Sequence, residues 1–207
     1  GVGAPRWLRC LHLRPPGLPF MRSTLTALCL LFCLGNTAPA VVPTPNQTLT
    51  AHETGVPPAR YFGQSMASNG QTLAVGAPYA VAGGGAAPGV VLLYQRGANG
   101  WNYVQALQAP VPANGDSFGF HLSFAGDQLL VSAPFSTASN VSERGIVYAY
   151  QPVANTYTLA QTINPGATVS SFEWFGFHSS ADSGWLAISV PLRGAFDSGQ
   201  VQLYYFD

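Results

Sequence analysis

From Val41 to Asp207 the sequence contains no lysine and no cysteine. The three cysteines (Cys10, Cys29 and Cys33) all precede Val41, so disulfides cannot hold the later part together. Four arginines stand there against eight acidic residues, which gives this part a net charge of about −4. Such a chain lacks the positive surface that nucleic acid or anionic lipid would need. We expect no nucleic-acid partner.

A long hydrophobic run is also missing. Met21 opens a segment with the three parts of a secretory signal: a basic residue (Arg22), an apolar stretch (Leu25–Leu34) and a small-x-small cleavage site (Ala38-Pro39-Ala40). The apolar stretch is about half of the roughly 20 residues that a membrane-spanning helix needs. We therefore expect a signal peptide that is cleaved after Ala40, a secreted or cell-surface location, and no membrane span in this chain.

A repeat begins with a Phe-Gly pair, which occurs at Phe62-Gly63, Phe118-Gly119 and Phe175-Gly176. Each pair is followed by an apolar-x-apolar-x-x-Pro pattern and then by an apolar run that starts with Gly. The patterns are Leu73, Val75 and Pro78; Leu129, Val131 and Pro134; Leu186, Ile188 and Pro191. The runs are 89–94, 145–150 and 199–204. Three copies at near-constant spacing indicate a repeat architecture.

Each copy predicts four short strands. Residues 118–125 alternate between apolar and other side chains, which is the period of a strand, and Gly126-Asp127 is typical of a tight hairpin. The second strand ends at the Pro, which has no N–H for a central ladder. After Ala40 no segment has a helical period. We expect an all-β fold of three four-stranded antiparallel sheets, each resembling a propeller blade.

The repeated residues resemble a known family. Phe-Gly followed by Val75-Gly76-Ala77-Pro78 resembles the FG-GAP repeat of integrin alpha-chain heads and of many secreted proteins, and 131–134 and 188–191 are degenerate versions. The resemblance covers about Gln47 to Tyr205. It implies a β-propeller, seven-bladed in the family, that acts in adhesion by binding an extracellular protein or glycan.

The repeats predict the organisation of the chain. Gln47-Thr48-Leu49 matches the fourth strand of the later copies, so a lone leading strand is expected there. Three blades cannot close a ring, and we expect a fragment of a seven-bladed ring; the alternative is closure by association. The predicted parts are 1–20 (upstream of the mature protein), 21–40 (signal peptide), 41–60 (linker with the leading strand), 61–116 (repeat 1), 117–173 (repeat 2) and 174–207 (repeat 3, incomplete).

We predict no catalytic residue, metal ligand or cofactor. The loops 79–88, 135–144 and 192–198 hold at most one acidic residue each, too few for the calcium loop found in integrin-like repeats. His121 and His178 share one offset after Phe-Gly, and we interpret them as duplicated strand positions, since two histidines alone make no zinc site. Ser179, His178 and Asp182 could be drawn as a triad, but no nucleophile elbow accompanies them.

Two further groups of residues leave alternatives open. Trp101, Tyr103, Trp174 and Trp185 pack the blades in our interpretation; the alternative is a sugar-stacking face. The sequons at Asn46 and Asn140 are glycosylation sites if the protein is eukaryotic.

The leading functional hypothesis is a non-enzymatic binding or adhesion module whose ligand the sequence does not identify. One alternative is a propeller-type enzyme that acts on glycans, which would need two converging carboxylates. The other is a structural ectodomain of a larger membrane-anchored protein.

Overall fold

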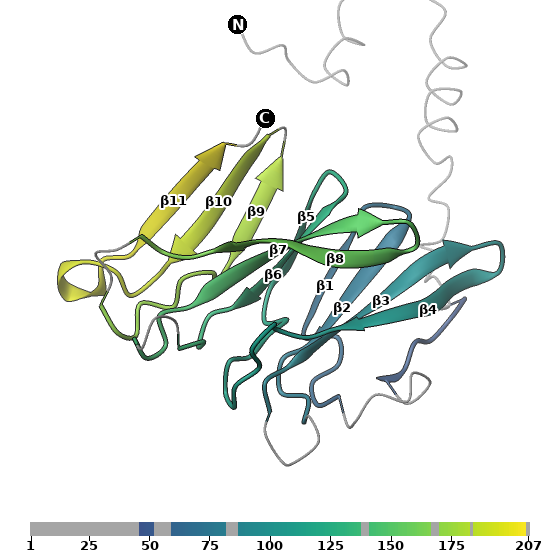
Figure 1. The fold of residues 1–207 in the computed structure, drawn as a ribbon, viewed down its shortest axis with the longest axis horizontal. Coiled ribbons are helices and arrows are strands. Elements are labelled where there is room, and N and C mark those ends of the chain that lie inside the picture. Colours follow the sequence, from purple (N-terminus) through teal and green to yellow (C-terminus); the bar gives the residue numbers. More distant parts are fainter. Residues whose placement is uncertain are drawn as a thin grey trace, which may run out of the picture. The chain divides into compact units, whose positions relative to one another are not determined.

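The computed structural model describes residues 46–51, 59–81, 87–137, 141–166, 170–182 and 184–205 (Figure 1). The predicted upstream segment, the signal peptide and Asn140 lie outside these residues, and they stay predictions. No helix in the described part is long and apolar enough to cross a membrane.

Within the described residues, eleven strands form three antiparallel sheets in the order of the sequence (Figure 1). Sheet 1 contains β1 (Ser65–Ser68), β2 (Thr72–Ala77), β3 (Val90–Gly97) and β4 (Gly100–Leu107). Sheet 2 contains β5 (Leu122–Ala125), β6 (Gln128–Ala133), β7 (Ile146–Val153) and β8 (Thr156–Ile163). Sheet 3 contains β9 (Ser179–Asp182), β10 (Trp185–Val190) and β11 (Gln200–Tyr205), with a 3-10 turn at Ala195–Asp197 before β11. The predicted all-β fold is confirmed, and these strands form no closed ring.

Two local expectations differ from the structure. The first strand of the second copy begins later than predicted: β5 starts at Leu122, because Phe118 forms only an isolated bridge to Gly89 and Gly119 lies in a turn with φ 86°. The leading segment at Gln47–Leu49 forms no strand, because no ladder partner for it exists among the described residues. A strand requires a neighbour that bonds its backbone.

The third strands of sheets 1 and 2, β3 and β7, each contribute to two cores. In β3, Val91 and Leu93 pack toward sheet 2, while Leu92 and Tyr94 pack on the opposite face. This alternation follows from the period of two in a strand. It explains why the Val/Leu/Tyr runs are apolar at successive positions: a strand between two cores is buried on both faces.

The Phe of the Phe-Gly pair joins one sheet to the next. Phe118 and Phe175 are 0% exposed, and each lies against the third strand of the preceding sheet. Phe118 N–H donates to Pro88 O over 2.8 Å, and Phe175 N–H donates to Arg144 O over 3.1 Å. Gly145 makes the second approach possible, because a Cβ at that residue would overlap the backbone of Phe175.

Candidate functional site

The loops gather at one end of each sheet, which we call the loop end. It consists of the segment before each Phe-Gly and the loop between the second and third strands. In sheet 2 these are the residues before Phe118 and the connection from β6 to β7; in sheet 3 they are the residues before Phe175 and the connection from β10 to β11. The loop ends of sheets 2 and 3 each hold a pocket.

The sheet-2 pocket has a volume of about 340 Å³. Asp116, Ser136 and Tyr148 are its buried lining residues, and Thr162 and Asn164 are exposed at its rim. The Asp116 carboxylate accepts a hydrogen bond from Ala113 N–H over 2.8 Å, which closes a short turn before Phe-Gly. Burial raises the pKa of Asp116 above its usual value, although hydrogen bonds act in the opposite direction.

The sheet-3 pocket has a volume of about 540 Å³ and is built on the same turn. Glu173 Oε1 accepts the N–H of Ser170 over 3.1 Å. Its other oxygen lies 3.5 Å from Nε of Arg193, and both side chains are largely buried. This buried carboxylate is therefore paired with a cation from its own sheet.

Four aromatic rings form a cluster that includes two loop-end residues, Phe135 and Trp174. Phe120, Phe135, Trp174 and Phe177, which we call the aromatic cluster, are each half-buried. Their ring centroids are 5.0 Å apart for Phe120–Phe177, 5.4 Å for Phe120–Phe135 and Phe135–Trp174, and 5.8 Å for Trp174–Phe177. The rings come from both sheets, so the cluster exists only because the sheets are neighbours.

The two histidines meet next to this cluster. The ring centroids of His121 and His178 are 5.1 Å apart in an edge arrangement. Nδ1 of His121 lies 3.2 Å from Oγ of Ser179, whose hydroxyl also lies 2.9 Å from that of Ser123. Burial lowers the pKa of His121, and the nearby His178 lowers it further. The part of the chain that the structure describes holds no group of three or more potential metal ligands.

The profile of the FG-GAP repeat matches residues 101–150. Residues 101–150 are an FG-GAP repeat. The match runs from β4 to β7, so this FG-GAP segment begins on the last strand of sheet 1 and ends on the third strand of sheet 2. A search of curated proteins finds no match to the chain.

The four large aromatic residues singled out in the sequence lie in different surroundings. Trp101 packs on the core of sheet 1, and Tyr103 contacts Tyr94 edge-on at 6.0 Å. Trp174 belongs to the aromatic cluster and donates its indole N–H to Glu143 over 2.9 Å. Trp185 is 53% exposed and lies against Tyr205 on the outer part of sheet 3. The structure therefore does not bring these four together on one face.

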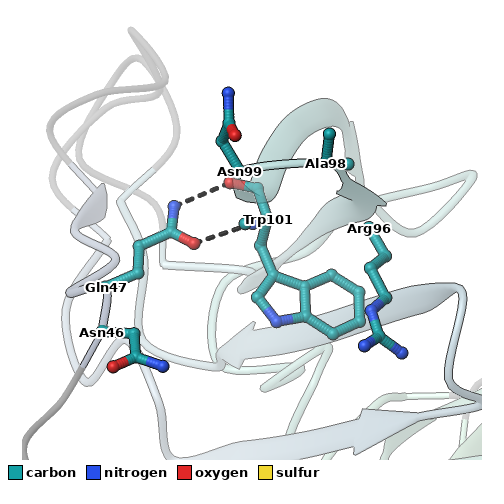
Figure 2. Close-up of a pocket in the computed structure, with 8 residues that line it drawn as sticks. Asn46, Gln47, Arg96, Ala98, Asn99 and Trp101 are labelled. Atoms are coloured by element: carbon teal, nitrogen blue, oxygen red, sulfur yellow. Dashed lines mark hydrogen bonds between the residues drawn. The ribbon is translucent and has the colours of Figure 1, made fainter.

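A repeated glutamine has a role that was not predicted from the sequence. Gln47 accepts a hydrogen bond from Trp101 N–H over 2.7 Å and donates one to Trp101 O over 2.8 Å (Figure 2). Gln105 makes the same two bonds to the backbone of Tyr157 in sheet 2. The alignment of Gln-x-apolar at both places was the available signal. Asn46 is exposed beside Gln47, at the rim of a pocket of about 520 Å³.

Proposed function

We propose that this FG-GAP domain is a secreted or cell-surface binding module, not an enzyme, and that its loop end recognises an extracellular protein or glycan. The observation that carries the proposal is the aromatic cluster. Half-buried aromatic rings on a rigid scaffold are typical anchors of binding interfaces, because they offer a large apolar contact area and lose little side-chain entropy.

The architecture supports the same proposal. Binding residues are often found on loops that a rigid framework positions. In this chain the loops before Phe118 and Phe175 are tied to the preceding sheets by backbone hydrogen bonds. Trp174 of the cluster lies on the loop before Phe175, so its backbone is held in place before any ligand arrives, which lowers the entropic cost of binding.

The acidic groups at the loop end favour binding over glycan hydrolysis. Glycosidases use two carboxylates on opposite sides of the scissile bond, about 5–9.5 Å apart. Asp116 is the one acidic residue among those lining the sheet-2 pocket, and the buried Glu173 of the sheet-3 pocket is engaged by Arg193. Neither pocket offers a pair of buried, unengaged carboxylates.

The test uses the full chain expressed in a secreting cell line and presented to an array of extracellular glycans and matrix proteins. The variants Phe120→Ala and Phe177→Ala should each weaken binding to any captured ligand by about tenfold or more. The matched control is Phe196→Ala, an exposed aromatic outside the cluster. Binding that both cluster variants leave unchanged, or cleavage of an arrayed glycan by the chain, would overturn the proposal.

A further inference from the structure

The pockets of sheets 2 and 3 occupy the same place in the repeat. Asp116 and Glu173 each stand two residues before the buried Phe and each bind the N–H three residues earlier. Ser136 and Arg193 each stand three residues after the end of the second strand. The backbones at these two positions are bonded alike: Ser136 N–H donates to Ala133 O and Arg193 N–H donates to Val190 O. Their carbonyls also accept equivalent bonds, from Gly145 and from Gly199.

One side chain distinguishes the pockets. In sheet 3 the buried carboxylate of Glu173 has the guanidinium of Arg193 at 3.5 Å. In sheet 2 the equivalent position carries Ser136, which has no positive charge, while Asp116 is only 5% exposed. Sheets 2 and 3 therefore each have a buried carboxylate at this position, Asp116 and Glu173, but only Glu173 has an arginine beside it.

The rest of the described chain does not supply the missing cation. The sequence has no lysine. Arg60 is exposed in the turn before β1 and Arg96 is exposed on β3, and Arg144 donates to the carbonyls of Pro165 and Gly166. Arg193 is engaged by Glu173. Among the described residues, Asp116 therefore has hydrogen-bond donors but no ion-pair partner.

A buried carboxylate in this state is costly, because water no longer solvates the charge and no opposite charge replaces the water. The raised pKa of Asp116 agrees with this, since burial is its main cause. A cation that enters the sheet-2 pocket would pair with Asp116, as Arg193 pairs with Glu173 in sheet 3. The space for it exists: the cavity of about 340 Å³ exceeds the size of an alkylammonium or alkylguanidinium group.

We propose that the sheet-2 pocket binds an organic cation, an alkylammonium or alkylguanidinium group, whose charge pairs with Asp116. Tyr148 and Ile146 provide an apolar wall for the alkyl part, and the exposed Thr162 and Asn164 offer oxygens at the rim. A calcium ion is a poorer fit, because it requires six to eight oxygen ligands and usually several carboxylates. The inference rests on the proposed function only in placing a ligand group at the same loop end.

The test titrates the full chain with n-butylammonium, n-butylguanidinium and the neutral isostere n-butylurea, followed by calorimetry and by NMR shifts of the loop amides. The two cations should bind, and n-butylurea should bind at least tenfold more weakly. Blocked lysine and arginine amides form a second arm. Binding of these amides as tight as that of the butyl compounds identifies a protein side chain as the source, and their exclusion identifies a free small amine.

Three variants sharpen the test. Asp116→Asn keeps an oxygen for Ala113 N–H but removes the charge, and it should lose binding of the cations at least tenfold. Ser136→Arg copies sheet 3, so it should abolish binding and raise the melting temperature. The matched control Asp127→Asn, an exposed carboxylate on a hairpin of the same sheet, should bind as the unmodified chain does.

Equal binding of n-butylurea, undiminished binding by Asp116→Asn, or cation binding that persists in a folded Ser136→Arg would each overturn the inference. Stoichiometric calcium binding that Asp116→Asn abolishes would also overturn it, in favour of a metal site. Failure here is distinguishable from failure of the proposed function. If the cation probes bind but the array captures no ligand, the inference about the sheet-2 pocket is supported and the proposed function is not. If the array captures a ligand that depends on the aromatic cluster but no cation probe binds, the proposed function is supported and the inference is not.

Discussion

The side-chain amide of Gln105 in sheet 1 bonds the backbone of Tyr157 in sheet 2 as the peptide group of a neighbouring strand would. Its Oε1 accepts the N–H of Tyr157 over 2.8 Å, and its Nε2 donates to the carbonyl of the same residue over 3.0 Å. The backbone of Tyr157 lies on the edge strand β8, where these groups have no further strand to bond. The glutamine therefore ties two sheets together through hydrogen bonds as well as through their apolar cores.

The first prediction removes this tie. Gln105→Ala should lower the free energy of unfolding by about 2 kcal/mol, because two part-buried hydrogen bonds are lost. Denaturant unfolding measures the change. Gln161→Ala is the matched control, since Gln161 has the same repeat position and is exposed in β8. We expect it to change stability by less than about 0.5 kcal/mol, and equal losses in the two variants would contradict this account.

The second prediction concerns the close approach of two backbones. Gly145 has φ 84°, and a Cβ at this position would overlap the carbonyl and amide of Phe175. Gly145→Ala should therefore destabilise the protein by about 3 kcal/mol, since both the backbone and its neighbour are strained. Gly166→Ala, at a glycine with open space around it, should be close to neutral. Thermal or denaturant unfolding of both variants decides the matter, and a neutral Gly145→Ala would count against the observed contact.

The third prediction is a dependence of stability on pH. The pKa of His121 is lowered from its usual 6.5, first by burial and then by His178. The unfolded chain thus binds a proton at a higher pH than the folded chain. The contribution of neutral His121 to the free energy of unfolding is therefore fully present above about pH 7.5, and it is lost as the pH falls below 6.5. His121→Gln should flatten the stability profile between about pH 7.5 and 5.5. Denaturant unfolding at several pH values tests this, and identical profiles for the variant and the unmodified chain would contradict it.

The fourth prediction concerns the outer face of β11. Val201 and Leu203 are 64% and 66% exposed, whereas their repeat equivalents Val147 and Ala149 in sheet 2 are 0% and 4% exposed under sheet 3. An uncovered apolar face of this kind promotes self-association. The double change Val201→Thr, Leu203→Thr should reduce concentration-dependent light scattering and leave stability within about 0.5 kcal/mol.

A control separates the position from the residue type. Val111 is 82% exposed on a loop, away from any strand. Val111→Thr should leave the scattering unchanged, because a single apolar side chain on a loop offers neither a flat face nor an open ladder. Scattering that Val111→Thr lowers as much as the double change would show that surface hydrophobicity, and not the β11 face, drives the association.

Much of the fold could be predicted because its signals are local. The alternation that gives β5 and β6, the hairpin at Gly126-Asp127 and the Pro that follows β6 all lie within a few residues of each other. Their repetition in three copies predicts the number and order of the sheets. The start of β5 was misplaced because Phe118 bonds Pro88 of the preceding sheet and Gly119 bonds Ser132 of β6, and these long-range contacts are not visible in the local alternation.

Less of the candidate site could be predicted. The offset shared by His121 and His178 is visible in the sequence, but the meeting of their rings depends on how sheets 2 and 3 pack. The aromatic cluster has the same origin, since Phe120 and Phe177 belong to different sheets. The sequence likewise shows one Asp and one Glu before two Phe-Gly pairs, without indicating that both are buried.

Local patterns in the sequence thus determined the repeat, the all-β class and the turn chemistry, because strand periodicity and hairpin preference act between near neighbours. Only the tertiary structure decided which side chains share a pocket. Asp116 and Ser136 come together because two loops of one sheet stack, and the equivalent stacking in sheet 3 brings Arg193 to Glu173. Whether a buried carboxylate forms an ion pair within its own sheet depends on how these two loops pack. The sequence of either loop alone does not show this pairing.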